Sequence, residues 1–582
     1  MGERIFIGVA WPYANGPLHL GHIAGAYLPA DIFARYHRIK GNKVLMVSGS
    51  DQHGTPITIQ AEQEGKKPSE ITSQYHQQFL NSWQRLGISF DLFTTTGTAN
   101  HAEVSQDIFL TLLDKGYIYK STVLQPFCPN CQRFLPDRYI EGTCPYCYSR
   151  GARGDQCDEC GKPINPAELI EPRCRICANT PEFKESEHCF FKLSAFEDRL
   201  LDWVKQQTHW RQNVLNFTIR YLEGGLKDRA ITRDIEWGVP VPLEGFEGKR
   251  LYVWFEAVIG YLSASKEWAK GTGDEDKWRP FWQKDGKARS YYFIGKDNIP
   301  FHTIVWPAIL RGYNDDLNPP YDVPANEFLT IEGRKLSTSH NWAVWLPDYL
   351  SRYDPDPLRY LLSINMPETG DTDFSWREFI RRNNDELVAT YGNLVHRVLT
   401  FVYRNFGGCV PEHSKYNEIC QYLDSLDPKK DLGRTNILDD PSMNVIEDAK
   451  EFLFRTAGDF LSKCQFRQAL LHILEFAQFV NRYLDSKSPW KVIKENQQAA
   501  ADSLYVALYA ISCLKTALYP FLPFSSQELH EYLGFKGKVE DYGWQPYSPL
   551  PGQKLREPQP LFTKLDEGLV EEETSCLGRA YH

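Results

Sequence analysis

The segment ERIFIGVAWPYANGPLHLGHIAGAYLPADIFARYHRIKG (residues 3–41), continued by NKVLMVSGSDQHGTP (42–56), decides the fold. Its opening, ERIFIGVAW, is a short, nearly continuous apolar run, which is typical of a buried parallel strand. After a loop rich in Pro, Asn and Gly, residues 19–41 predict a helix that ends at Gly41 and is kinked at Pro29. Residues 42–56 predict a second strand. This order predicts an α/β fold with a doubly wound, Rossmann-type domain, which binds ligands beyond the carboxyl ends of its strands.

The composition limits the class of protein. A chain of 582 residues with 24% charged and 42% hydrophobic residues is typical of a folded soluble protein of several domains. No run approaches the ~18 apolar residues of a membrane helix, and no signal peptide opens the chain, so we expect a cytoplasmic protein without membrane contact. The 65 basic and 75 acidic residues give a net charge of −10, which excludes a nonspecific nucleic-acid coat but not local RNA binding.

The pattern along the chain predicts several regions. Residues 1–116 and 226–325 form the two halves of the α/β domain, because RLYVWFEAVIGYL (250–262) and SYYFIGKDNIPFHTIVWPAIL (290–310) restore its strand and helix pattern. Residues 117–225, rich in cysteine, form an insertion between them. Residues 326–384 follow the second half, and long helical patterns from 385 to 560 predict an all-α bundle. A tail covers 561–582.

Eight of the 14 cysteines form four CxxC pairs, in CPNC (128–131), CPYC (144–147), CDEC (157–160) and CRIC (174–177). Each pair presents two thiolates to one ion, and two pairs complete a tetrahedral set of four. Four pairs therefore predict two closed, structural zinc sites. A single CxxC is equally consistent with a redox motif, but four together make that interpretation improbable. The four pairs can be grouped in three ways, and spacing alone does not choose among them.

Two motifs suggest phosphate chemistry. HLGH (19–22) opens a helix directly after a strand, where backbone N–H groups favour phosphate, Gly21 permits close approach and two imidazoles can donate hydrogen bonds. GRKLSTS (333–339) is a flexible stretch that carries Lys335. Taken alone, the first motif is more often a pair of surface histidines, and the second a solvated loop.

Together the two motifs resemble the paired ATP motifs of the class I aminoacyl-tRNA synthetases. The resemblance narrows to the methionyl-tRNA synthetase family through AWPYANGPLHLGH (10–22), GSDQHGTP (49–56), the CxxC pairs, ITRDIEWGVPVP (231–242), YVWFEAVIGY (252–261), FIGKDNIPFHTIVWPA (293–308), KLSTS (335–339), YGNLVHR (391–397) and NRYLDSKSPW (481–490). The family's usual loop reads KMSKS, so Thr338 replaces its second lysine. A hydroxyl cannot supply a cation there.

The resemblance implies site residues for ATP, which is bound with Mg²⁺, and for methionine. The implied catalytic residues are His19, His22 and Lys335. The implied ATP-binding residues are His19, Gly21, His22, Asp297, Lys335, Ser337 and Thr338, with Arg233 and Lys296 in the same polar set. The implied methionine-binding residues are Ala10, Trp11, Tyr13, Asp51, Trp254, Ala257, Val258, Tyr261 and His302. Asp51 would meet the ammonium group, and Val258 stands where the family usually has Pro.

The resemblance also bears on zinc and tRNA. The family's zinc knuckle matches the inner pairs, so Cys144, Cys147, Cys157 and Cys160 would bind the first ion, and Cys128, Cys131, Cys174 and Cys177 the second. Residues 326–384 would hold the KMSKS-type loop and contact the tRNA stem. Helical periodicity places Asn393 and Arg397 opposite an apolar face in residues 385–406, and these two residues with Trp490 match the family's anticodon-reading positions. An ordinary solvated polar face beside a core tryptophan is the alternative.

The resemblance implies an enzyme that forms methionyl-adenylate from methionine and ATP, releases pyrophosphate and then charges tRNA(Met), as a monomer. Two alternatives stay open. A tRNA-binding paralogue without activity is suggested only by Thr338. A related enzyme for a branched aliphatic amino acid usually has a large editing domain, whereas this insertion is dominated by CxxC pairs.

Overall fold

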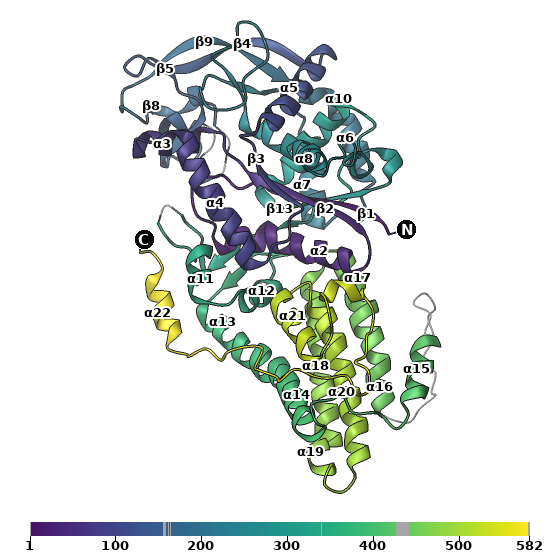
Figure 1. Ribbon diagram of the computed structural model, residues 1–582. Helices are drawn as coiled ribbons and strands as arrows, with labels where there is room; N and C mark the ends of the chain where they lie inside the picture. The colour runs from purple at the N-terminus through teal and green to yellow at the C-terminus, as the bar shows by residue number, and fades with distance from the viewer. Residues whose placement is uncertain are drawn as a thin grey trace.

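The computed structural model describes residues 2–154, 157, 159–160, 162, 164–338, 340–425 and 441–579. Figure 1 shows an α/β part that carries the amino terminus, a bundle of helices below it, and a final helix α22 (Leu569–Cys576) that lies beside helices α11 (Leu346–Arg352) and α13 (Trp376–Arg382). No helix in the described ranges is long and apolar enough to cross a membrane.

A five-stranded parallel sheet forms the centre of the α/β part, in the order β14, β13, β1, β2, β3. The strands span Arg4–Val9 (β1), Lys43–Ser50 (β2), Leu92–Thr95 (β3), Arg289–Gly295 (β13) and Ala325–Asn326 (β14). The strand order reverses at β1, and sheets of this type bind ligands at the carboxyl edge next to such a reversal. The predicted doubly wound fold is confirmed, with the cysteine-rich segment between β3 and β13.

Successive side chains of β1 point to opposite faces of this sheet. Ile5, Ile7 and Val9 join one apolar core with helix α2 (Leu28–Ile39) and the helical bundle. Phe6 joins a second core with α5 (Ala99–Asp114), α8 (Val253–Gly271) and α10 (Trp306–Tyr313). Because both faces are covered, the strand is apolar throughout instead of alternating with polar residues.

The helix after β1 continues through Pro29. It begins as α1 (Leu20–His22), passes through a π-helical turn η1 (Ile23–Tyr27) and continues as α2. Gly41 follows its end with φ +84°, a conformation that favours glycine. The predicted helix and its end at Gly41 are confirmed, and the irregularity takes the form of a π turn just before the proline.

Among its described residues, the cysteine-rich segment contains two antiparallel sheets and two α-helices. β4 (Ile118–Cys128) pairs along its length with β9 (Glu182–Phe191), and β6 (Ile140–Thr143) lies between β7 (Arg150–Arg153) and β8 (Ile170–Cys174). These strands lie at the top of Figure 1. Helices α6 (Glu197–Lys205) and α7 (Gln212–Glu223) instead bury Leu200 and Val214 in the second core of the parallel sheet.

The region after β14 is a connecting layer between the sheet and the bundle. It contains a small sheet of β15 (Leu329–Ile331), β16 (Arg334–Lys335) and β17 (Thr372–Phe374). Its helices are α11 (Leu346–Arg352), α12 (Pro355–Ile364) and α13 (Trp376–Arg382).

The predicted all-α bundle is confirmed. Its helices are η8 (Asn383–Gly392), α14 (Asn393–Asn405), α15 (Tyr416–Ser425), α16 (Pro441–Asp448), η9 (Ala449–Thr456), α17 (Ala457–Ser462), α18 (Phe466–Lys487), α19 (Pro489–Val492), α20 (Gln497–Leu518) and α21 (Pro523–Tyr532). α20 is buried almost all round from Ala500 onward, as expected of a central bundle helix.

Candidate active site

The two histidines of HLGH form a stacked pair at the carboxyl edge of the sheet. Their ring centroids are 3.8 Å apart, and the backbone N–H of His19 donates to Nδ1 of His22 (3.2 Å). Burial lowers the pKa of His22 to about 4. The pKa of His19 is well below its usual value, mainly because of burial and also because of the neighbouring His22. At neutral pH both rings are therefore uncharged, and His22 carries its proton on Nε2, where it can be donated to a ligand.

The HLGH turn is bonded to the chain that follows the KLSTS loop. The N–H of Leu20 donates to the carbonyl of Val344 (3.2 Å), and that of Leu346 donates to the carbonyl of Leu18 (2.8 Å). A Cβ on Gly21 would lie 2.6 Å from Cδ1 of Leu336 in the loop. The structure thus brings the two predicted motifs together. The space beside Gly21, which the sequence analysis assigned to a nucleotide, is filled here by Leu336.

Residues 335–338 of KLSTS lie on a surface hairpin, and Ser339 lies outside the described residues. Glu332 and Gly333, both with positive φ, turn β15 into β16. Ser337 pairs through its backbone with Trp342 (3.1 and 2.9 Å), and the carbonyl of exposed Thr338 accepts from the N–H of Asn341 (3.2 Å). The side chain of Lys335 is exposed and forms no ion pair with any described residue. Its ammonium lies 5.7 Å from the ring centroid of Phe328.

Two of the other predicted polar residues, Lys296 and Asp297, lie near Lys335 of this hairpin. Burial raises the pKa of Asp297, and the charges of Lys296 and Lys335 partly offset this increase. Lys296 is engaged by two carboxylates, Glu327 (2.7 Å) and Asp371 (2.8 Å). Arg233 stacks on the ring of Tyr252 at 3.7 Å and lines a small cleft with Tyr13, Gly54 and Trp254.

The aromatic residues predicted for methionine come together at the ends of β1 and α8. Trp254 donates from Nε1 to the hydroxyl of Tyr13 (3.0 Å), and the ring of Trp11 lies 6.5 Å from that of Tyr261. Tyr261 bonds to Nε2 of His302 (2.7 Å). Nδ1 of this imidazole faces the carbonyl of Asn298 (2.9 Å), which can only accept, so Nε2 accepts from the tyrosine.

His302 is therefore a neutral histidine, and burial lowers its pKa to about 4. Ala257 and Val258 lie on the first turns of α8, between Trp254 and Tyr261. Ala10 directly follows β1, and its N–H donates to the carbonyl of Phe293 (3.1 Å). The structure thus brings Tyr13 together with Trp254, and Trp11 and His302 together with Tyr261.

Asp51 is a buried carboxylate at the carboxyl end of β2. It is 4% exposed, its backbone pairs with Tyr13, and Oδ1 accepts from the N–H of His53 (3.1 Å). Burial, and then the charge of Glu256, raise its pKa well above the usual value. None of the described lysine or arginine side chains pairs with it. A ligand ammonium group would supply the missing counter-charge.

A buried network that was not predicted from the sequence lies behind Asp51. Glu256, fully buried on α8, bonds to Nδ1 of His53 (2.7 Å) and to Nε2 of His101, and His101 Nδ1 bonds to Ser263 (2.9 Å). Although burial raises the pKa of Glu256, the two histidines lower it to about 2. The available signal was an acidic residue inside the apolar run VWFEAVIGYL, since a carboxylate there requires partners.

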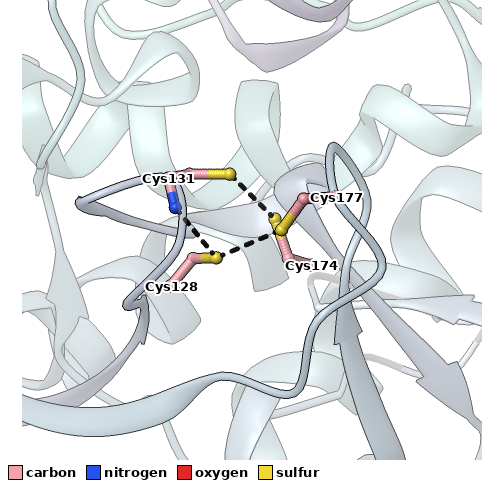
Figure 2. Close-up of side chains that lie close together, drawn as sticks. All are labelled: Cys128, Cys131, Cys174 and Cys177. Carbon is pink, nitrogen blue, oxygen red and sulfur yellow. Dashed lines mark hydrogen bonds between the residues drawn. The ribbon is translucent and has the colours of Figure 1, made fainter.

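The eight CxxC cysteines form two groups of four, in the nested arrangement. Cys128 and Cys131 face Cys174 and Cys177 (Figure 2), and Cys144 and Cys147 face Cys157 and Cys160. The Sγ atoms lie 3.4 Å (Cys128–Cys177) and 3.9 Å (Cys131–Cys174) apart in the first group. The distances are 3.9 Å (Cys144–Cys160) and 3.6 Å (Cys147–Cys157) in the second. A tetrahedral zinc with ~2.3 Å bonds requires sulfurs about 3.8 Å apart, so both groups fit the ion.

The candidate tRNA-binding residues lie at the end of the bundle that is far from the sheet, near α19 in Figure 1. Arg397 lies over the ring of Trp490 at 4.4 Å and near Asp485 (3.5 Å). Asn393 is exposed one turn earlier on α14. Trp490 is half-buried, so part of its ring is accessible.

Comparisons with known proteins agree with this geometry. A family model described as "tRNA synthetases class I (M)" matches residues 5–399, and one described as "Anticodon binding domain of methionyl tRNA ligase" matches residues 440–577. A methionine–tRNA ligase from Dehalococcoides mccartyi is 61% identical over 578 residues, which cover 99% of this chain and 100% of that protein. The chain belongs to the methionine–tRNA ligase family.

Further relatives support this membership. A methionine–tRNA ligase from Thermomicrobium roseum is 51% identical over 603 residues, covering 99% of each protein. The solved structure of Mycobacterium tuberculosis methionyl-tRNA synthetase in complex with methionyl-adenylate matches with a TM-score of 0.76 at 24% identity, covering 96% of this chain and 99% of that one. This likeness shows that the two chains share the fold.

Proposed function

We propose that this protein attaches L-methionine to tRNA(Met) in two steps, by forming methionyl-adenylate from ATP and then transferring the methionyl group to the terminal adenosine of the tRNA. The observation that carries the proposal is the meeting of HLGH and KLSTS, together with the Tyr13–Trp254 aromatic pair in the loop after β1. The backbone of Tyr13 pairs with that of Asp51, a buried carboxylate that has no lysine or arginine partner among the described residues. Its family membership supports the same activity.

In the first step, a carboxylate oxygen of methionine attacks the α-phosphorus of ATP, and the bond from that phosphorus to the pyrophosphate oxygen breaks. No enzyme nucleophile is needed, so the protein positions the reactants and stabilises the developing charge. Neutral His19 and His22 would donate N–H groups to the phosphoryl oxygens, and Lys335 would supply a cation from its hairpin. Mg²⁺ bound with ATP supplies further charge neutralisation.

The remaining predicted ATP contacts are Gly21, Asp297, Ser337 and Thr338, which lie in or beside these two motifs. For methionine, Asp51 would accept the ammonium group. The side chain would enter the aromatic site, because a polarisable thioether packs well against rings. The fixed Tyr261–His302 pair would form a rigid wall, since each hydroxyl and ring nitrogen already has a partner.

The experiment that tests this proposal is pyrophosphate exchange into ATP with each of the twenty amino acids, followed by charging of tRNA(Met). Exchange with methionine alone is expected. Exchange with a branched aliphatic amino acid would instead identify the protein as a related enzyme for that amino acid. A complete lack of exchange would favour the inactive tRNA-binding paralogue, for which Thr338 in place of a lysine is the one supporting feature.

For tRNA recognition, we propose that Asn393, Arg397 and Trp490 read the anticodon. An exposed part of an aromatic ring beside an arginine is suited to stacking on an unpaired base. Trp490→Ala should lower the kcat/KM of tRNA charging about 5- to 150-fold, since base stacking is worth ~1–3 kcal/mol. Methionine activation should be unchanged. A parallel loss of both activities would identify Trp490 as a packing residue.

For metal, we propose that each group of four cysteines binds one structural zinc ion. Elemental analysis should give two zinc ions per chain. Cys144→Ser and Cys174→Ser should each remove a different ion, because the two residues lie in separate groups. Loss of both ions from either variant would contradict independent sites. We also expect a monomer, and light scattering during gel filtration tests this.

A further inference from the structure

The carbonyl of Ala24, which lies in the π turn directly after His22, has lost its helical hydrogen-bond donor. In η1 the N–H of Leu28 donates to the carbonyl of Ile23. The next donor in this i to i+5 register would be residue 29. Pro29 has no N–H, so the chain's own helix cannot satisfy Ala24. A buried carbonyl in this position needs a donor from elsewhere.

Asn326, at the end of β14, supplies that donor. Its Nδ2 donates to the carbonyl of Ala24 (2.8 Å), and the side chain is almost completely buried. Its Oδ1 accepts from Nη1 of Arg211 (2.7 Å). The two contacts fix the orientation of the amide, because only its nitrogen can face Ala24 and only its oxygen can face the guanidinium.

Arg211, just before α7, joins this amide to the helical bundle. Its Nη1 also donates to the carbonyls of Ala325 (3.1 Å) and Glu368 (3.3 Å), and Nη2 donates to the carbonyl of Cys464 (2.9 Å). Cys464 lies in the turn between α17 and α18. A planar guanidinium can hold several carbonyls in one fixed geometry, which a lysine ammonium cannot.

The first turn of α18 is held in a second way at the same place. The carboxylate of Glu368 accepts from the backbone N–H of Arg467 (3.1 Å), the second residue of that helix. A carboxylate at a helix N-terminus is favoured by the free N–H groups and the helix dipole. The amino end of α18 is thus fixed against the α/β part by both Arg211 and Glu368.

The other end of α18 lies at the candidate anticodon site. The helix has 22 residues, about 33 Å at 1.5 Å per residue, and Asp485 near its end lies 3.5 Å from Arg397. Figure 1 shows α18 running from the α/β part toward α19, which carries Trp490. One rigid element therefore connects the Arg211 junction to the residues proposed to read tRNA.

We propose that Arg211 and Asn326 are positioning residues, which hold the π turn behind His19 and His22 and couple it to the first turn of α18. This inference rests on the proposed function. It assigns to these two side chains the task of transmitting the state of the tRNA-bound bundle to the HLGH pair. Neither residue is among those proposed to bind methionine or ATP.

The test uses two variants of the full-length protein. Arg211→Lys keeps the charge and loses the planar fork, and Asn326→Asp keeps the shape and removes the donor to Ala24. Arg199→Lys is the matched control, because Arg199 lies on the neighbouring helix α6 and pairs only with surface Asp315 among the described residues. In methionine-dependent pyrophosphate exchange, both test variants should lose about tenfold in kcat with an unchanged KM for methionine. The control should match the parent protein.

A second readout separates coupling from simple folding. The ratio of charging rates for whole tRNA and for a fragment with only the acceptor stem should fall at least threefold in Arg211→Lys, since the bundle no longer acts on the HLGH pair. The kcat of the double variant should be only slightly lower than that of either single variant, because both substitutions disrupt the same chain of contacts. A lower melting temperature with normal kcat and an unchanged ratio would overturn the inference. Failure of the parent protein to exchange with methionine would instead refute the proposed function.

Discussion

The two motifs that meet at the candidate ATP site are built in opposite ways. HLGH opens a helix from the core, its imidazoles are stacked on each other, and its backbone is bonded to residues 344 and 346. KLSTS lies on a surface hairpin, where the cationic side chain of Lys335 and the side chain of Thr338 are both exposed. One motif offers fixed neutral donors, and the other a charge on a long, solvated side chain.

This difference suggests a division of roles. Fixed donors need no reorganisation as charge develops, so they act mainly on the transition state. A cation on an exposed hairpin can approach the polyphosphate and withdraw, which suits a step that must also release pyrophosphate. The fixed motif should therefore tolerate less change than the hairpin, and three substitutions test this order.

The largest effect is expected for His19→Ala. The rate of methionine-dependent pyrophosphate exchange should fall about 10²–10³-fold, since removing one preorganised donor costs ~2.7–4 kcal/mol. His19→Asn, which retains an N–H donor, should recover part of the rate. A fall of less than tenfold in His19→Ala, with the protein folded, would show that the fixed motif does not dominate.

Lys335→Ala should have the next largest effect, a fall of roughly a hundredfold, because a charged contact to the polyphosphate is lost in the transition state. The effect should weaken as salt concentration rises, since exposed charges are screened. Arg334→Ala is the control, because the guanidinium of this neighbouring arginine lies over the ring of Trp342 (4.7 Å). Equal losses in both variants would assign the effect to the general charge of the hairpin.

The features that could be predicted from the sequence are those fixed by local pattern. The apolar run of β1 and the helix to Gly41 depend on nearby residues, and paired thiolates at CxxC spacing can only converge on few arrangements. The helical bundle could be predicted in the same way, because apolar residues recur at helical spacing along α14 and form one apolar face. Local periodicity and spacing carry this information without knowledge of the fold.

The features that could not be predicted depend on residues that meet only after folding. Glu256 forms hydrogen bonds with His53 and His101, which come from two other segments of the chain. Leu336 fills the space beside Gly21. Asn326 compensates for a donor that Pro29 lacks. In each case one partner looks ordinary along the chain, and its role follows from the long-range contact alone.

The smallest effect is expected for Thr338→Lys, which restores the family's usual lysine. The hairpin should fold unchanged, because the hydrogen bond that Thr338 makes to a described residue uses its backbone carbonyl, which accepts from the N–H of Asn341. An added exposed charge is worth ~0.2–1 kcal/mol, so the exchange rate should stay equal or rise up to about fivefold, most clearly at low salt. Thr338→Val, which keeps the shape and removes the hydroxyl, is the matched variant and should leave the rate unchanged. If the exchange rate fell more than tenfold in both Thr338→Lys and Thr338→Val, the hydroxyl itself would be a required ligand. The hairpin would then act through a positioned donor, as HLGH does, and the contrast between the two motifs would fail.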